Sequence, residues 1–169
     1  MGCFKEEDYE NNSWQELLQK LDKKVQETIN TSIESHALDL LYAVGACESP
    51  IEQLMAIALE SLELKCVNLA DNGCFVINPQ CEIGCLGNKY RADFLICTIF
   101  QGKSYELVIE CDGHDYHEKT KEQARRDKRR DRNMTKAGYI VMRFTGSEIW
   151  KNPYKCASEA LSTIFPFRV

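Results

Sequence analysis

The stretch from Leu107 to Arg143 constrains the fold of this chain more than any other part. It begins with an apolar run that leads into Glu110, Asp112 and two histidines, and it continues through a segment dense in Lys and Arg. The stretch ends with Gly138 and a second apolar run, whose last residue is Arg143. This order predicts a buried strand, a basic helix and a second buried strand, with acidic side chains at the end of the first strand.

Capping residues and hydrophobic periodicity predict the helices and strands in the rest of the chain. Ser13 and Ser49 are expected to cap helices, with Pro50 at a first helical position. Periodicity predicts helices over 14–29, 33–44, 50–62, 119–137 and 154–164, and strands over 74–77, 91–99, 105–111 and 139–144. Turn residues such as Asn78-Pro79 and Gly84 are expected to separate the strands of a meander. The fold class is therefore α/β, a mixed β-sheet flanked by α-helices. We expect an N-terminal helical extension over 1–46 and one globular domain over 47–169.

Composition indicates the expected localisation of the protein and the redox state of its cysteines. No apolar run is long enough to span a membrane, and the N-terminus is acidic where a signal peptide is basic. We therefore expect a cytoplasmic protein with no membrane partner. The nine cysteines are scattered and odd in number, which favours reduced thiols. A zinc-binding interaction protein, using Cys74, Cys81 and Cys85 with or without Cys66, stays an alternative, although no spacing has the two-residue gap of a zinc knuckle.

The net charge of −5 conceals an uneven distribution. Between Lys119 and Lys136 there are nine basic and three acidic residues, a local charge of +6, while the remaining residues carry −11. A concentrated positive segment on an acidic body is typical of a surface that binds a polyanion. The alternative is a solvated helix face held by internal ion pairs. The predicted nucleic-acid-binding residues are Lys119, Lys121, Arg125, Arg126, Lys128, Arg129, Arg130 and Arg132.

Carboxylates gather around the predicted central strand. Alternate residues of a strand point to the same face, so Glu110 and Asp112 should project together, roughly 6.5 Å apart. Two neighbouring carboxylates repel, and a divalent cation relieves that repulsion. Asp93, in the preceding strand, is the expected third oxygen ligand, and Glu52 on the first turn of its helix is placed to close the site. Each carboxylate alone is as well explained as a solvated or capping residue, so their convergence carries the prediction.

His114 and His117 follow directly after these carboxylates. Imidazole titrates near neutral pH, so either histidine can act as a metal ligand, a general base or a general acid. The alternative is that they only cap the helix that follows. Carboxylates, imidazoles and clustered arginines together are what metal-assisted hydrolysis of a nucleic acid requires.

Several ordered motifs resemble the restriction-endonuclease-like superfamily, also written PD-(D/E)XK. They are Glu-Ser-Pro-Ile-Glu at 48–52, Tyr-Arg-Ala-Asp-Phe at 90–94, Val-Ile-Glu-Cys-Asp-Gly at 108–113 with the following His114 and His117, Arg-Asp at 130–131, and Gly-Tyr-Ile-Val-Met-Arg-Phe at 138–144. The branch that the chain resembles is that of the very-short-patch-repair-like endonucleases. The resemblance implies a restriction-endonuclease-like core and a metal-dependent endonuclease that hydrolyses DNA phosphodiester bonds with Mg²⁺ or Mn²⁺.

The resemblance also implies roles for individual residues. Asp93 matches the metal-binding aspartate, Glu110 the acidic residue of the Glu-x-Lys element, and Glu52 the helix glutamate; the metal ligands would be Asp93, Glu110 and Asp112. Asp112 stands where that element has lysine, so Lys119, Lys128 or Arg130 is expected to supply the missing positive charge. DNA is the expected partner, and the sequence leaves open RNA, a homodimer, a larger nucleic-acid-processing complex, and a non-catalytic binding module on the same fold.

Overall fold

The computed structural model describes residues 13–21, 23–66, 75–100, 102–113 and 121–165. The chain divides into two compact units, Met1–Asp39 and Leu40–Val169. This division falls inside helix α3 (Lys23–Ala46), and the predicted domain boundary between residues 46 and 47 stays a prediction. No helix in the described ranges is both long and apolar enough to cross a membrane.

The first unit contains α2 (Trp14–Gln19) and the start of α3. Ser13 caps α2 as predicted: its hydroxyl accepts a hydrogen bond from the Glu16 backbone N–H at 3.4 Å, and the Glu16 carboxylate accepts one from the Ser13 N–H at 2.7 Å. The predicted helices over 14–29 and 33–44 were wrong in their bounds, because α3 runs unbroken through residues 30–32. Thr31 there donates its hydroxyl to the Glu27 carbonyl at 2.9 Å, which satisfies it within the helix.

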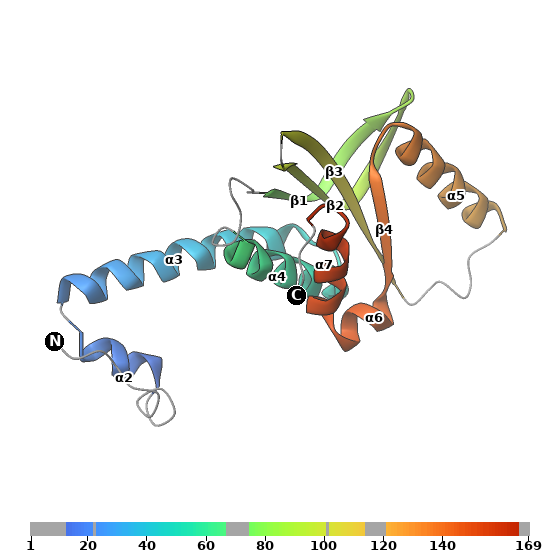
Figure 1. Ribbon diagram of the computed structural model, residues 1–169. Helices are drawn as coiled ribbons and strands as arrows, with labels where there is room; N and C mark the ends of the chain where they lie inside the picture. Colours follow the sequence, from blue (N-terminus) through green and yellow to red (C-terminus); the bar gives the residue numbers. More distant parts are fainter. Residues whose placement is uncertain (1–12, 22, 67–74, 101, 114–120, 166–169) are drawn as a thin grey trace. The chain divides into compact units, whose positions relative to one another are not determined.

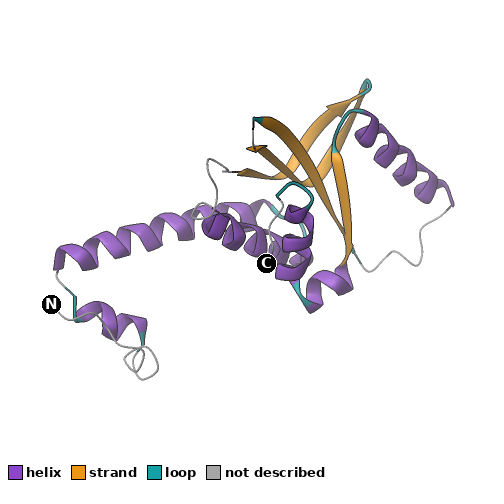
Figure 2. Cartoon of the chain, viewed as in Figure 1, coloured by secondary structure: helices purple, strands orange, loops and turns teal. Residues whose placement is uncertain are grey.

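The second unit is built on one four-stranded sheet in the order β1-β2-β3-β4 (Figures 1 and 2). The strands are β1 (Phe75–Cys85), β2 (Asn88–Phe100), β3 (Lys103–Asp112) and β4 (Ile140–Thr145); the helices are α4 (Pro50–Cys66), α5 (Lys121–Lys136), α6 (Gly146–Lys151) and α7 (Pro153–Ser162). The pairs β1–β2 and β2–β3 are antiparallel, whereas β3 and β4 are parallel, with α5 in the connection between them. This confirms the predicted α/β class with a mixed sheet flanked by helices.

The strand β1 is longer than the sequence indicated. We expected Asn78-Pro79 and Gly84 to break the chain, but β1 continues through them and pairs with β2 up to Cys85. Proline lacks a backbone N–H and is therefore tolerated mainly in edge strands, and β1 is the edge of the sheet. Helix α6 was also missed; it is one short turn-like helix whose start is fixed by a capping box between Thr145 and Glu148.

The sheet has an apolar core on each face. On one face Phe94, Ile96 and Ile109 pack with residues of α4, α6 and α7, and Phe75 stacks at 5.8 Å between ring centroids on Phe165. On the other face Leu95 and Val108 pack with Met134 of α5. Because alternate side chains of β3 serve the two cores, the strand is buried from Leu107 to Cys111. The polar residues at its end therefore stand on a rigid support.

Candidate active site

The carboxylates predicted from the sequence meet where β2 and β3 stop pairing. The pairing of these strands ends at Phe94 opposite Ile109, so Asp93 and Glu110 come next on the two strands. Asp93 accepts a hydrogen bond from the Cys111 backbone N–H at 2.7 Å, which gives that N–H an acceptor where the ladder ends. The charges of Asp93, Glu110 and Asp112 act on one another, so the structure brings these three together.

Glu110 is a buried carboxylate, with only 6% of its side chain exposed. Its pKa is raised to about 7, chiefly by burial; Arg130 and Arg143 oppose this rise, and the negative charges of Asp93 and Asp112 contribute to it. The pKa of Asp93 is also raised, chiefly by burial, although its hydrogen bond from Cys111 opposes the shift. Negative charge at this end of the sheet is therefore unfavourable unless a cation accompanies it.

Arg130 of α5 supplies one such cation. Its guanidinium donates to the Glu110 carboxylate and to the backbone carbonyl of Arg91, and its centre lies 5.9 Å from the centroid of the Tyr90 ring. Asn133, one turn further along α5, donates to the Tyr90 hydroxyl at 2.8 Å. Arg130 is one of the three cations expected to replace the missing lysine charge, and it contacts Glu110; of the other two, Lys128 is exposed and Lys119 lies outside the described residues. Its predicted part in nucleic-acid binding stays a prediction.

Arg143 of β4 supplies the second cation. It is paired with Glu110 in the parallel register of β3 and β4, and its guanidinium donates to Asp112 at 3.0 Å. It also donates two hydrogen bonds to the Asp131 carboxylate of α5, at 3.2 and 2.8 Å. A guanidinium suits this forked geometry, which a lysine ammonium does not reproduce. Arg143 therefore connects β3, β4 and α5 at the carboxylate cluster.

Glu52 lies near the cluster but is held by its own helix start. Its charge raises the pKa of Asp93, which places it within electrostatic reach. Its carboxylate accepts hydrogen bonds from the Glu48 N–H at 2.8 Å, the Ser49 hydroxyl at 2.7 Å and the Gln80 amide at 2.7 Å. Glu52 thus secures the first turn of α4 and ties it to β1, and its predicted catalytic role stays a prediction.

Gln80 reaches Glu52 from an unusual backbone conformation. Its φ of 50° lies in the left-handed region, which non-glycine residues rarely adopt. In the β1–β2 register it falls opposite Asp93, between the paired residues Pro79 and Cys81. A backbone deviation of this kind often accompanies a functional site.

Two thiols at the cluster are kept neutral. Burial raises the pKa of Cys47 to about 12, and the nearby charges of Glu52 and Asp93 act in the same direction. Burial also raises the pKa of Cys111, again with Asp93 and Glu52 adding to the shift. Because the thiolate is the form that attacks electrophiles or binds metals, neither cysteine is suited to those roles here.

The donor set suits a hard divalent cation. Asp93, Glu110 and Asp112 offer carboxylate oxygens, and a cation would offset the burial that raises the pKa of Glu110. In the arrangement described, however, Arg130 and Arg143 occupy this position beside Glu110 and Asp112. Within the described ranges no group of three or more His, Cys, Asp or Glu side chains is placed so that it could hold a metal ion. His114 and His117 lie outside those ranges.

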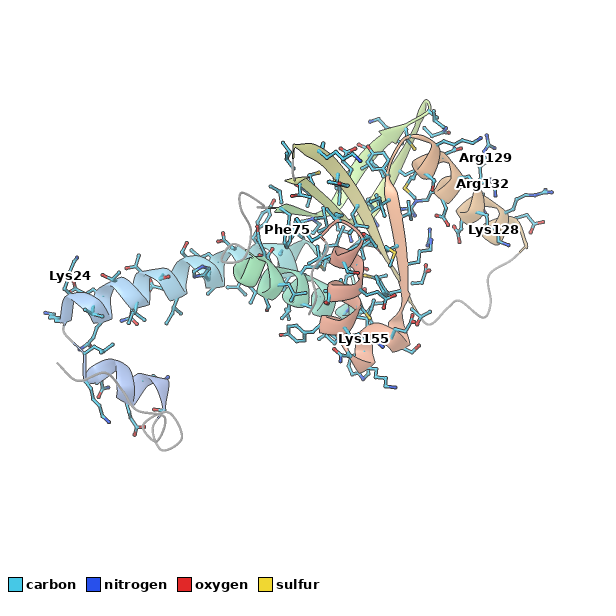
Figure 3. The ribbon with its side chains drawn as sticks, viewed as in Figure 1. Lys24, Phe75, Lys128, Arg129, Arg132 and Lys155 are labelled. Carbon is cyan, nitrogen blue, oxygen red and sulfur yellow. The ribbon has the colours of Figure 1, made fainter. Side chains whose placement is uncertain are left out.

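Apart from Arg130, the basic residues of α5 whose side chains are described are exposed. Figure 3 shows Lys128, Arg129 and Arg132 pointing outward from the helix, and all three are exposed. Arg125 and Arg126 are exposed as well. These five residues, Arg125, Arg126, Lys128, Arg129 and Arg132, form what we call the basic face. Lys119 lies outside the described residues, as does the side chain of Lys121.

The sequence did not assign Arg143, Asp131 or Gln80 to the site. Arg143 carried a usable signal, because a charged residue inside the apolar run of a predicted strand requires a partner of opposite charge. Asp131 is part of one of the motifs of the resemblance, together with Arg130, but the sequence gives it no role of its own. Gln80 carried no such signal, since its position depends on a local backbone conformation that residue type does not reveal.

An open mixed sheet flanked by helices, with acidic residues at the end of its central strands, agrees with a restriction-endonuclease-like core. The family model REase_MTES_1575, which describes a restriction-endonuclease-like family, matches residues 66–164. The match covers more than half of the chain, and the chain belongs to this family. Membership indicates a nuclease, with a nucleic acid as its substrate.

No curated protein and no solved structure matches the chain at a significant level.

Proposed function

We propose that the protein is a metal-dependent endonuclease that hydrolyses DNA phosphodiester bonds. The observation that carries the proposal is the gathering of Asp93, Glu110 and Asp112 at the ends of β2 and β3, in a chain of a restriction-endonuclease-like family. Family membership alone would not be sufficient, because function depends on the site and not on the fold. This chain also has carboxylates at that position, and metal-dependent hydrolysis needs such oxygen ligands for the metal ion.

Asp93, Glu110 and Asp112 would hold the cofactor, Mg²⁺ or Mn²⁺, through carboxylate oxygens. When bound, such an ion lowers the pKa of water and stabilises negative charge that builds up on a phosphate. The three side chains would contribute their negative charge and fixed positions. Asp93 is oriented by the Cys111 N–H and Asp112 by Arg143, and the ion pairs with Arg130 and Arg143 would have to open before Glu110 and Asp112 could bind an ion.

Other residues would handle the proton and the substrate backbone. His114 or His117 would transfer a proton, since imidazole titrates near the pH of the cell. The basic face of α5 would bind phosphates of the nucleic acid, which gives positioning without sequence readout. Arg130, in contact with Glu110, would move its guanidinium toward a phosphate oxygen when a metal ion takes its place on that carboxylate.

We also propose that the chain lies in the very-short-patch-repair-like branch. The support is Asp112 in place of the usual lysine, together with histidines that follow within five residues. DNA is the proposed substrate, and RNA of the same sequence is the comparison that tests it. Cutting both strands in concert needs two sites, so the proposal for double-strand cleavage includes a homodimer or a larger complex, in the cytoplasm.

A plasmid-nicking assay with Mg²⁺, Mn²⁺ or a chelator tests the proposed function. Cleavage is expected with either metal and not with chelator. Glu110→Gln, which removes a proposed ligand but keeps the side-chain shape, should abolish cleavage. The matched control is Glu106→Gln, an exposed glutamate on the same strand, which should cleave as the wild type does. Full activity of Glu110→Gln in a clean preparation would overturn the assignment.

One observation favours the non-catalytic alternative. Glu110 and Asp112 are each paired with a guanidinium, of Arg130 and Arg143 respectively, so these two carboxylates have cationic partners without a metal ion. A nucleic-acid-binding module that has no cleavage step would keep these ion pairs and the basic face. It would bind DNA in a salt-dependent manner and leave plasmid intact in every metal. The nicking assay therefore separates the two functions.

A further inference from the structure

A pocket opens beside the carboxylate cluster and takes no part in the function proposed so far. Its volume is about 680 Å³, within the range of about 300–1,000 Å³ that is usual for small-molecule sites. It lies among the start of α4, the end of β3 and helix α6. The residues that matter for its chemistry are Pro50, Ile51, Glu52, Cys111, Trp150 and Lys151.

The pocket approaches the carboxylate cluster on the side of Asp93. Cys111, which lines the pocket, lies between Glu110 and Asp112 in β3 with its side chain on the opposite face of the sheet, and its N–H donates to Asp93. Glu52, whose charge acts on Asp93, lines the pocket from α4. A nucleotide next to a phosphodiester held at Asp93 would therefore lie within reach of the pocket.

Trp150 gives the pocket an aromatic wall. The side chain is a large apolar surface, yet 70% of the residue is exposed. Pro50 and Ile51 add aliphatic surface. An exposed indole beside aliphatic side chains is suited to stacking a flat ring, and the face of any nucleobase is such a ring.

Lys151 gives the pocket a positive charge at its rim. The residue is exposed and follows Trp150 in α6. A cation adjoining a stacking surface is complementary to a nucleotide, which presents a flat base and an anionic phosphate together. A purely apolar ligand would make no ionic contact with the Lys151 ammonium group. Charge and shape therefore favour a nucleotide over an apolar small molecule.

We propose that this pocket receives an unpaired nucleobase, stacked on Trp150, from the nucleotide next to the phosphodiester at the carboxylates. The inference rests on the proposed function and deepens it. A base within an intact duplex is stacked and paired, and it must leave the helix before it can enter a protein pocket. The preferred substrate class is therefore nucleic acid with an unpaired nucleotide beside the cut: a single strand, a mismatch or a bulge.

Binding is tested by tryptophan fluorescence in chelator, where no metal-dependent cleavage occurs. The chain has two tryptophans, so a Trp14→Phe background leaves Trp150 as the reporter. The probes are a fully paired DNA duplex, the same duplex with one unpaired adenine, and the single strand. Quenching by the unpaired and single-stranded probes at concentrations where the paired duplex gives none supports the pocket. Equal responses to all three probes overturn it.

Cleavage of the same probes in Mg²⁺ gives the second readout. Trp150→Ala should reduce the ratio of the rates for unpaired and paired probes about 10-fold, in line with the loss of one base–aromatic stack. Trp150→Phe, which keeps an aromatic face, should recover most of that ratio. Tyr154→Ala is the matched control: Tyr154 is 48% exposed on α7 and does not line the pocket, so the ratio should stay unchanged.

The two readouts separate failure of the pocket from failure of the proposed function. Quenching selective for unpaired bases, without cleavage of any probe, keeps the pocket and removes the nuclease. Cleavage that is indifferent to pairing and to Trp150→Ala keeps the nuclease and removes the pocket. Neither selective quenching nor cleavage overturns both.

Discussion

Arg130 of α5 donates a hydrogen bond to Glu110 of β3, although 20 residues separate them in the chain. Helix α5, which follows β3 in the chain, therefore places a positive charge at the acidic end of β3. Only 6% of the Glu110 side chain and 22% of the Arg130 side chain are exposed. A partly buried pair of this kind fixes α5 against the sheet at the site where the chemistry is proposed.

We predict that Arg130→Ala destabilises the protein by about 3 kcal/mol at pH 8, because removal of one partner leaves a buried charge uncompensated. Urea unfolding in chelator measures the change. Arg129→Ala, which removes an exposed guanidinium from the adjacent position of α5, should stay within about 0.5 kcal/mol of the wild type. Equal losses in the two variants would mean that the contact with Glu110 contributes nothing.

The raised pKa of Glu110 predicts a pH dependence of stability. Burial raises this pKa from 4.5 to about 7, so the folded protein holds the proton more tightly than the unfolded chain does. Its contribution to stability is present in full below pH 4.5 and is lost as the pH rises through about 7. The loss amounts to at most about 3 kcal/mol.

Urea unfolding in chelator between pH 5 and pH 8 measures this dependence. Glu110→Gln is neutral at every pH and should therefore lose less stability over that interval than the wild type does. Asp93, whose pKa is also raised chiefly by burial, contributes in the same direction in both proteins. A wild type whose stability rises across the interval would show that Arg130 outweighs the burial of Glu110.

The carboxylate cluster was predictable because strand geometry is periodic. Alternation in β3 put Glu110 and Asp112 on one face, and the hairpin with β2 added Asp93. Glu52 was expected at the cluster and lies within electrostatic reach of Asp93, but the hydrogen bonds that hold it at the start of α4 were not foreseen. It also precedes residues 66–164, which the family model matches.

The cations of the site were less predictable than its acids. A basic helix offers many arginines, and the rotation of α5 on the sheet determines which of them faces Glu110. Met134, buried against the sheet, sets that rotation, and Arg130 lies one turn before it on the same side. Long-range packing thus distinguishes Arg130 from Arg129, and local sequence does not. The continuity of α3 and of β1 escaped prediction for a related reason, because polar and turn residues are tolerated on exposed or edge elements.

Substitution of Arg143 should lower the stability of the protein more than is usual for a partly exposed residue. Arg143→Ala would leave both Asp112 and Asp131 without their guanidinium, and we expect a loss of about 3 kcal/mol. Arg143→Lys should recover only part of it, because an ammonium cannot make the forked contact with Asp131. Thermal or urea unfolding of both variants tests this. The control is Lys89→Ala, which removes the exposed pair of Lys89 with Glu82 and should change stability by less than about 1 kcal/mol.

The hairpin between β1 and β2 contains a substitution that should stabilise the protein. Leu86 and Gly87 connect the paired residues Cys85 and Asn88, with φ values of 50° and 77°. A two-residue turn with positive φ at both positions favours Asn-Gly, whereas leucine is strained there. Leu86→Asn should therefore add about 1 kcal/mol in urea unfolding. Leu86→Ala keeps the strain, so a gain of the same size from alanine would assign the effect to the loss of an exposed apolar side chain.

The basic face of α5 should govern the salt dependence of DNA binding. Each phosphate neutralised on duplex DNA contributes about 0.9 to the slope of log K against log salt. Replacing Lys128, Arg129 and Arg132 with alanine together should therefore reduce the slope by up to about 3, and should weaken binding to unrelated sequences equally. Binding isotherms at several salt concentrations, with chelator present, provide the measurement. The matched control is Lys24→Ala, on the exposed part of α3, which should leave the slope unchanged. If the slope persists in the triple variant, the phosphate contacts lie elsewhere and the excess charge of α5 serves the protein itself.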